Sequence, residues 1–271
     1  MLLSPMIKKH SLLERMKRFN LSKILRRHSI PDDRWHGVTR ELPLLNRYTP
    51  VEKAQLRVLS TLFLQRKSFT GAHGLEITPE MQLIVAAQAC VQILELGISS
   101  FDGWHSIIIY PDAFVVERQV SDDYGLVHDE SRALGGEAWM QGPVLLSWDD
   151  VERDSFRLNR GHHIIIHEFA HKLDMLNGRA NGMPPLHPDM AIEDWTRSLS
   201  RAYQHLRSDV AHHKGDINAY AATDPAEFFA VVCEYFFTAP DILYEHYPDV
   251  YQQLRAYFRQ DIFQRSGLTA R

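Results

Sequence analysis

Apolar residues recur three and four positions apart in the first third of the chain, the spacing that brings side chains to one face of a helix. One such segment runs from Pro50 to Phe69, with apolar residues at positions 51, 56, 58, 59, 62, 63 and 64. A second runs from Pro79 to Leu96 and stops at Gly97, a residue type that commonly follows a helix end. The pattern therefore predicts two helices before residue 100.

Two later segments are rich in β-branched and aromatic residues, which favour a pleated, half-buried surface. Residues 106–116 (SIIIYPDAFVV) and 142–151 (GPVLLSWDDV) are predicted strands, the first broken at Pro111 because proline donates no backbone hydrogen bond. Polar and glycine-containing segments lie between them, including DDYGLVHDE, and predict loops or a hairpin.

Helical spacing returns after Gly161 and continues almost to the end of the chain. We expect helices at 161–175, 191–211, 225–238 and 241–258. Helices, then a small mixed sheet, then helices again are typical of the α+β class, here mainly helical.

Composition and charge restrict the kind of protein. A chain of 271 residues with 45% hydrophobic and 24% charged residues has enough apolar material for one globular domain. Its net charge of -4 supplies no global field to attract nucleic acid, so we expect no direct nucleic-acid binding. Cys90 and Cys233 form no disulfide framework, and no run of about 18 apolar residues is present. We expect no secretory signal, no membrane span and a cytoplasmic location.

The N-terminal part of the chain is basic. Residues 8–27 carry eight lysines and arginines against one acid, Glu14, with apolar residues between them. One interpretation is contact with an anionic surface or a partner groove, and the other is a solvated or frayed helix that leads into the fold. We therefore expect an N-terminal arm over residues 1–43.

The strongest chemical signal is the string His167-Glu168-Phe169-Ala170-His171 inside a predicted helix. Residues four apart lie on one face of a helix, so both imidazoles reach a single ion. Zinc accepts nitrogen and carboxylate ligands, and a catalytic site keeps three protein ligands and one water. Glu168 is placed to take a proton from that water as general base. The alternative is a helix with incidental polar residues, among which His162 and His163 are interpreted as ordinary.

A third protein ligand is needed, and a nearby histidine does not supply it, because Asn177 stands where the metzincin extension has its third histidine. The segment from Asp224 to Glu227 offers a carboxylate at the start of the next apolar helix, where Glu227 also occupies the capping-box position. Glu234, seven residues on and on the same face, is the rival. Spacing alone does not separate Glu227 as ligand from Glu227 as cap, nor from Glu234.

Several long strings carry a family resemblance. They are LELGISSFDGWHSIIIYPDAFVV, YGLVHDE, QGPVLLSWDDV, IIIHEFAHKLD and INAYAATDPAEFFAVVCEYFF. In this order they resemble the Mlc titration factor A family of bacterial zinc metallopeptidases, whose catalytic part is similar to the anthrax lethal factor protease domain. The resemblance covers roughly residues 44–263 and implies a zincin-type, gluzincin-like fold with one Zn²⁺ per chain.

The resemblance also implies roles for particular residues. His167, His171 and Glu227 would bind zinc, which makes Glu234 a supporting acid. Tyr220 would donate a hydrogen bond to the oxyanion, against the alternative of a packing tyrosine. His128 would approach the metal as a fourth ligand that moves aside before substrate binds, against the alternative of a loop histidine without metal contact.

We therefore expect a single zinc metallopeptidase domain over residues 44–271 that hydrolyses peptide or protein substrates, and the sequence does not separate aminopeptidase from endopeptidase action. The strand at 143–151 would align substrate by edge pairing, and Asp174 would either orient a ligand imidazole or be solvated. The alternative is a binding protein that sequesters a transcription regulator. The resemblance names a repressor of the Mlc type as that partner, although no motif for it can be recognised in this chain.

Overall fold

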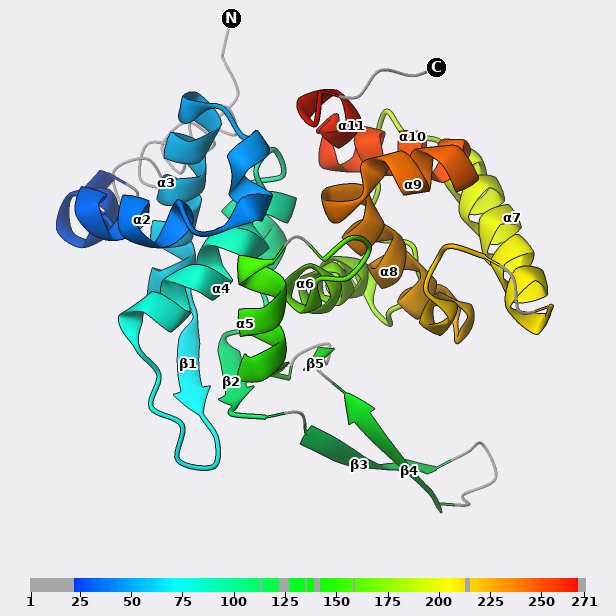
Figure 1. Cartoon of the computed structure of the whole chain (residues 1–271), viewed down its shortest axis with the longest axis horizontal. Coiled ribbons are helices and arrows are strands. Elements are labelled where there is room, and N and C mark those ends of the chain that lie inside the picture. Colours follow the sequence, from blue (N-terminus) through cyan, green and yellow to red (C-terminus); the bar gives the residue numbers. More distant parts are fainter. Residues whose placement is uncertain are drawn as a thin grey trace, which may run out of the picture.

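The fold is that of a computed structural model, which describes residues 22–112, 114–121, 127–134, 136–138, 142–157, 159–212 and 215–267. Between 114 and 138 it describes the backbone only. The α-helices labelled in Figure 1 are α2 (Asp32–Thr39), α3 (Pro50–Arg66), α4 (Pro79–Gln92), α5 (Trp148–Phe156), α6 (Ile164–Asp174), α7 (Ile192–Ala211), α8 (Pro225–Thr238), α9 (Pro240–His246), α10 (Pro248–Phe258) and α11 (Ile262–Arg265). Short 3-10 helices are η1 (Pro43–Arg47), η2 (Ile98–Phe101), η3 (Met175–Asn177) and η4 (Ala219–Ala222).

The strands are β1 (Ser68–Gly71), β2 (Ser106–Tyr110), β3 (Phe114–Ser121), β4 (Val127–Leu134), β5 (Gly136–Ala138) and β6 (Val144–Ser147). Four of them form a small mixed sheet in the order β1-β2-β6-β5, in which only β5 is antiparallel to its neighbour. β3 and β4 pair separately as an antiparallel hairpin that projects from the body of the molecule (Figure 1). The α+β class with a small mixed sheet is thus confirmed.

Three predicted elements differ from the observed ones. The strand expected at 106–116 is divided between β2 and β3, which belong to different sheets. The strand expected at 142–151 ends at Ser147, whose hydroxyl accepts a hydrogen bond from the Asp150 amide and starts α5. The helix expected at 241–258 is two helices, because Pro248 begins a new one at α10.

The predicted N-terminal arm over residues 1–43 is described only in part. Its basic stretch falls largely on residues 8–21, which lie outside the described residues. From residue 30 on, the chain packs into the main core through Ile30, Trp35 and Leu42, none of which is more than 5% exposed. Residues 30–43 are therefore part of the domain.

Helix α6 occupies the centre of the molecule, with α4 and α5 on one side and α8 on the other (Figure 1). All eleven of its residues are buried. Phe169 fixes its rear face, since its ring lies 5.6 Å from that of Phe63, 5.2 Å from that of Phe101 and 5.7 Å from that of Trp104. Such close aromatic packing holds the helix in one position.

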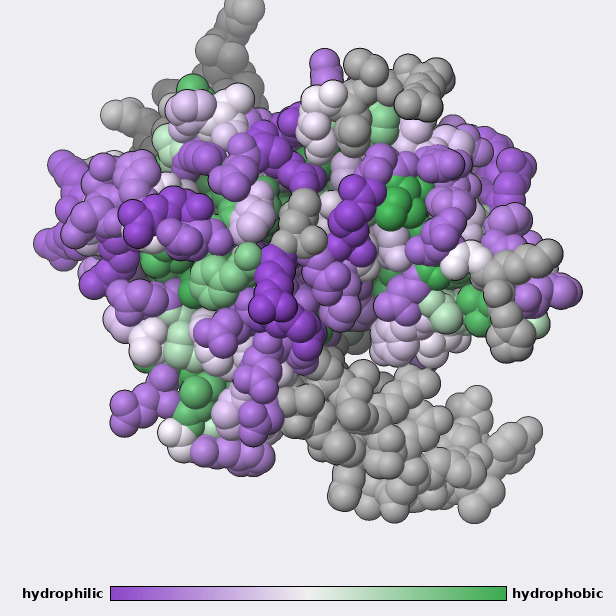
Figure 2. All heavy atoms as spheres, viewed as in Figure 1, coloured by the Kyte–Doolittle hydropathy of each residue, from purple (hydrophilic) through white to green (hydrophobic). Residues whose placement is uncertain are grey.

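The outer surface is polar over most of the face shown in Figure 2, where hydrophobic residues appear in small separate areas. No helix among the described residues has both the length and the apolar character required to cross a bilayer.

Candidate metal centre

The two histidines of α6 lie side by side, as their spacing predicts. The Nε2 atoms of His167 and His171 are 3.2 Å apart, and their ring centroids are 4.9 Å apart. Each residue is less than 10% exposed. Two imidazole nitrogens thus converge on one point at the surface of α6, which we call the metal point because a metal ion would bind there.

Helix α8 brings a carboxylate to the same point. Asp224 caps this helix, since its Oδ1 accepts the amide hydrogens of Ala226 at 2.8 Å and of Glu227 at 2.9 Å. The Glu227 carboxylate instead faces α6, with Oε2 3.1 Å from Nε2 of His167 and 3.5 Å from Nε2 of His171. In the part of the chain that the structure describes, these three side chains form the one cluster with metal-ligand spacing.

The size of this cluster fits a zinc ion. Ligand atoms about 2.1 Å from a tetrahedral ion lie about 3.4 Å from one another. The observed edges of the triangle are 3.2, 3.1 and 3.5 Å. Two nitrogens and one carboxylate oxygen are also the donor set that zinc accepts, and three protein ligands leave a position for water.

Glu234 lies on the other side of the His167 ring. Its Oε1 is 2.8 Å from Nδ1 of His167. A carboxylate only accepts, so Nδ1 donates and Nε2 is left to face the metal point. Glu234 is therefore placed to orient the first histidine, and the rival interpretation of Glu234 as a ligand is not supported.

The same carboxylate joins a buried network at the start of α6. Oε2 of Glu234 accepts the backbone N–H of His163 and lies 3.2 Å from Nδ1 of His162. On α5, Oδ2 of Asp154 accepts the backbone N–H of Ile164 at 2.9 Å. Neighbouring elements thus supply acceptors to the first N–H groups of α6, which no earlier residue of the helix can satisfy.

Sequence reasoning missed this network. The spacing predicts no role for His163, but this residue is 2% exposed and its Nε2 lies 2.9 Å from Oε1 of Gln88 on α4. The string GHHIII, with two histidines directly before a run of buried isoleucines, was the available signal. Nothing in the spacing of Asp154 or Gln88 relates them to the site.

Electrostatics couples these groups. Burial alone would lower the pKa of His167, but the carboxylates of Glu227 and Glu234 outweigh burial and raise that pKa well above 6.5. Burial alone would raise the pKa of Glu227, but its contacts with His167 and His171 hold it well below its usual range. A metal ion that binds here therefore takes the place of a proton.

The proposed general base, Glu168, directly follows His167 on α6 and is 1% exposed. One turn on, Lys172 donates a hydrogen bond from Nζ to the Gly142 carbonyl at 2.9 Å. Burial lowers the pKa of Lys172 to about 8, although the nearby Glu168 charge acts in the opposite direction. Glu168 thus shares its buried setting with a lysine.

The structure places the side chain of Tyr220 but not that of His128. Tyr220 lies on η4, half-buried, with its ring centroid 6.0 Å from that of His167. This places the tyrosine beside the metal point. His128 lies on β4, where its backbone pairs with Val120 of β3, and its side chain falls outside the described part of the chain.

Asp174, at the end of α6, is fully buried, so the interpretation of a solvated residue is wrong. Its Oδ2 accepts the N–H groups of Asn181 at 2.8 Å and Gly182 at 2.7 Å. Asp174 therefore holds the loop that follows α6 in place.

The prediction that strand 143–151 aligns substrate at a sheet edge is wrong. β6 lies inside the sheet, hydrogen-bonded to β2 on one side and β5 on the other. The edge on this side of the sheet is β5, so β6 has no unpaired backbone edge to offer a substrate.

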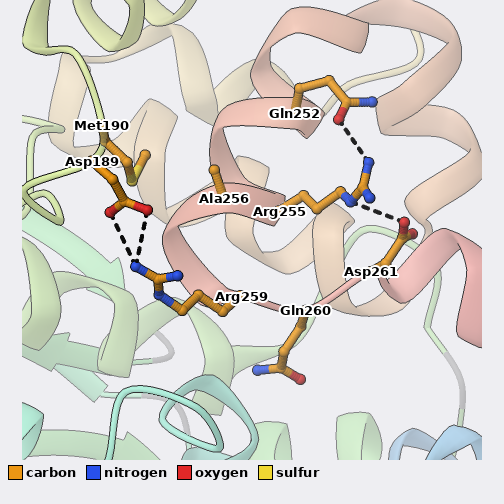
Figure 3. A pocket seen from close by; sticks show the side chains of 8 residues that line it. All are labelled: Asp189, Met190, Gln252, Arg255, Ala256, Arg259, Gln260 and Asp261. Carbon is orange, nitrogen blue, oxygen red and sulfur yellow. Dashed lines mark hydrogen bonds and ion pairs between the residues drawn. The ribbon is translucent and has the colours of Figure 1, made fainter.

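A surface hollow between α10 and the residues before α7 is unrelated to this centre (Figure 3). On one wall Arg259 donates to Oδ1 of Asp189 at 3.0 Å, and on the other Arg255 lies 3.0 Å from Oδ2 of Asp261. The two guanidinium groups point in opposite directions toward these partners. The charges of the hollow are paired with one another, and we assign no ligand to it.

Comparison with known proteins gives consistent matches. A family model described as glucose-regulated metallo-peptidase M90 matches residues 14–259. The Mlc titration factor A of Klebsiella pneumoniae (strain 342) is 42% identical over 228 residues, which cover 83% of this chain and 85% of that protein. The Mlc titration factor A of Salmonella typhimurium is 42% identical over 233 residues, which cover 84% of this chain and 87% of that protein.

Proposed function

Because the chain belongs to the glucose-regulated metallo-peptidase M90 family, we propose that it is a zinc-dependent peptidase whose zinc ligands are His167, His171 and Glu227. The resemblance noted from its sequence is thereby confirmed. The single observation that carries the proposal is the triangle of ligand atoms with edges of 3.2, 3.1 and 3.5 Å. The zincin-type, gluzincin-like fold and one zinc per chain are parts of the same proposal.

The residues around the triangle divide the work of hydrolysis. A bound zinc ion would supply an acidified water and polarisation of the substrate carbonyl. Glu168 accepts the proton of the attacking water and passes it to the leaving amine. Tyr220 donates a hydrogen bond where negative charge develops on the carbonyl oxygen. Glu234 keeps the imidazole of His167 oriented through Nδ1.

Four purified proteins test the proposal, with zinc content and peptide hydrolysis measured on each. We expect wild type to hold about one zinc and to cleave, Glu168→Gln to hold zinc without cleaving, and Glu227→Ala to lose zinc. Glu193→Ala, at an exposed position in the first turn of α7, is the matched control and should resemble wild type. Zinc retained by Glu227→Ala, or hydrolysis retained by Glu168→Gln, contradicts the assignment.

Aminopeptidase action is tested with a matched pair of peptides, one with a free and one with an acetylated amino terminus. Loss of cleavage on acetylation supports it, and equal cleavage of both peptides rejects it. The proposal also keeps the cytoplasm as the place of action, which the free, buried cysteines Cys90 and Cys233 support.

A second candidate is a protein that sequesters a transcriptional repressor of the Mlc type. The observation that favours it is the name of the relatives, Mlc titration factor A. Glu168→Gln separates the two candidates, because a sequestering protein keeps its affinity for the repressor when the general base is lost. If wild type binds the repressor and cleaves no peptide, the second candidate replaces the first.

A further inference from the structure

We propose that Tyr235 of α8 is a positioning residue, whose hydroxyl holds the segment that carries Tyr220 beside the metal centre. The inference rests on the proposed function in one respect, namely that Tyr220 contributes to hydrolysis. Nothing in the sequence pattern points to Tyr235, which falls among the apolar residues of its helix.

The Tyr235 hydroxyl bridges two backbone groups of the segment that precedes η4. It accepts the backbone N–H of Asn218 at 3.1 Å and donates to the backbone carbonyl of Asp216 at 3.0 Å. Asn218 in turn caps η4, because its side-chain Oδ1 accepts the N–H of Tyr220 at 3.0 Å. Tyr235 thus holds the backbone of Asn218, and the side chain of Asn218 holds the backbone N–H of Tyr220.

The ring of Tyr235 is itself fixed. It is 5% exposed, and it packs against the backbone of Gly161, where an added Cβ would meet Cζ of the ring at only 2.3 Å. Gly161 is held in turn, since its N–H donates to Oγ1 of Thr238 at 2.9 Å. The hydroxyl therefore stands at a defined point on the helix that also carries Glu227.

The far end of η4 has a weaker anchor. The hydroxyl of Tyr203 on α7 donates to the carbonyl of Ala222 at 3.3 Å. Tyr235 acts closer to Tyr220 and makes two contacts, whereas Tyr203 makes one. We therefore assign the holding of Tyr220 mainly to Tyr235.

A Tyr235→Phe variant removes the hydroxyl and keeps the ring. Because Asp216 and Asn218 are exposed, water can satisfy their backbone groups and the fold is retained. We expect kcat to fall about 10-fold with KM changed less than about 2-fold, since a misplaced oxyanion donor weakens the transition state and not substrate binding. Zinc content should stay at the wild-type value.

A double variant tests whether Tyr235 acts through Tyr220. Tyr220→Phe alone should lower kcat about 100-fold, as loss of one oxyanion donor does. Adding Tyr235→Phe should then change kcat by less than about 2-fold, because the group it positions is gone. A full additional 10-fold loss in the double variant overturns the proposal.

Tyr251→Phe is the matched control. Its hydroxyl makes the same kind of bridge, from Oδ1 of Asp261 at 2.8 Å to the N–H of Phe263 at 2.8 Å, in a turn away from the metal centre. This variant should keep the kcat of wild type. A loss equal to that of Tyr235→Phe would show a general effect of removing a buried hydroxyl and would overturn the proposal.

Amide hydrogen exchange answers the question without hydrolysis. In zinc-loaded Tyr235→Phe the amides of residues 218–222 should exchange at least about 10-fold faster than in wild type, and those of α6 should be unchanged. Unchanged exchange at 218–222 overturns the proposal. If wild type cleaves no peptide, the proposed function fails, and exchange alone decides whether Tyr235 holds the segment.

Discussion

Replacing Glu234 by glutamine tests how strongly the proposed metal centre depends on a residue that is not one of its proposed ligands. Oε1 of the carboxylate accepts a hydrogen from Nδ1 of His167, and Oε2 accepts the backbone N–H of His163 and also lies 3.2 Å from Nδ1 of His162. Glutamine has the same shape but only one accepting oxygen. One of the two donors must therefore face the amide NH₂ group.

The structure indicates which of the two donors would face the glutamine NH₂ group. The N–H of His163 cannot change, so the glutamine oxygen serves it and the NH₂ group faces the imidazole of His167. That ring then accepts at Nδ1 and carries its proton at Nε2, the atom 3.1 Å from Oε2 of Glu227. An imidazole with its proton at Nε2 cannot bind zinc through that atom.

The expected magnitude is a zinc affinity lower by about 10-fold to 100-fold, as for other residues that orient a ligand histidine. This corresponds to about 1.4 to 2.7 kcal/mol of binding free energy. Water does not relieve the conflict, because Glu234 is only 4% exposed.

The assay is competition between metal-free protein and a chromophoric chelator at constant pH. Glu193→Gln, at an exposed position on α7, is the control for the same chemical change and should bind zinc as wild type does. The reasoning is refuted if folded Glu234→Gln binds zinc within about 2-fold of wild type, since the network would then add nothing to the ligand.

Two further predictions concern stability. Gly161→Ala should lower the free energy of unfolding by about 2 kcal/mol or more in a urea titration, because the residue has φ +78° and its new Cβ would overlap the ring of Tyr235. The control is Gly37→Ala in α2, where nothing lies within 4 Å of the added Cβ, and it should raise the free energy of unfolding by up to about 1 kcal/mol. The pKa of His167 is raised in the folded protein, so protonation of His167 adds fully to the free energy of unfolding below the unfolded value of 6.5. This contribution is lost as the pH rises through the folded pKa. The His167–Glu227 cluster of metal-free protein should therefore contribute less to the free energy of unfolding at pH 8 than at pH 6.5. Zinc-loaded protein, in which the proton has left Nε2 of His167, should not show this loss in the same titration.

Local chemistry explains which elements were predictable. α8 begins and ends where expected, because Asp224 and Pro225 mark its start and its interior is continuously apolar. The start of α5 was missed, because WDDV has little helical periodicity and depends on the Ser147 cap. The position of β6 inside the sheet was equally unreadable, since β5 is only three residues long and the parallel pairing of β6 with β2 joins residues far apart in the chain.

The candidate ligands show where spacing stops being informative. His167 and His171 were found because an interval of four on a helix is itself a geometric statement. An interval of seven is also informative, because it places Glu227 and Glu234 on the same face of α8, about 10.5 Å apart along the helix axis. Which of them meets the metal depends on how α8 crosses α6, and that crossing is set by packing between residues distant in the chain.

The crossing places the His167 ring between the two carboxylates. Glu227 lies against Nε2 and Glu234 against Nδ1, so each acid occupies one end of a single imidazole. The shared face that made the two indistinguishable in sequence is therefore the face that allows both to act on His167. In the proposed metal centre, one acid would complete the ligand triangle, and the other would keep the histidine in the tautomer that the triangle requires.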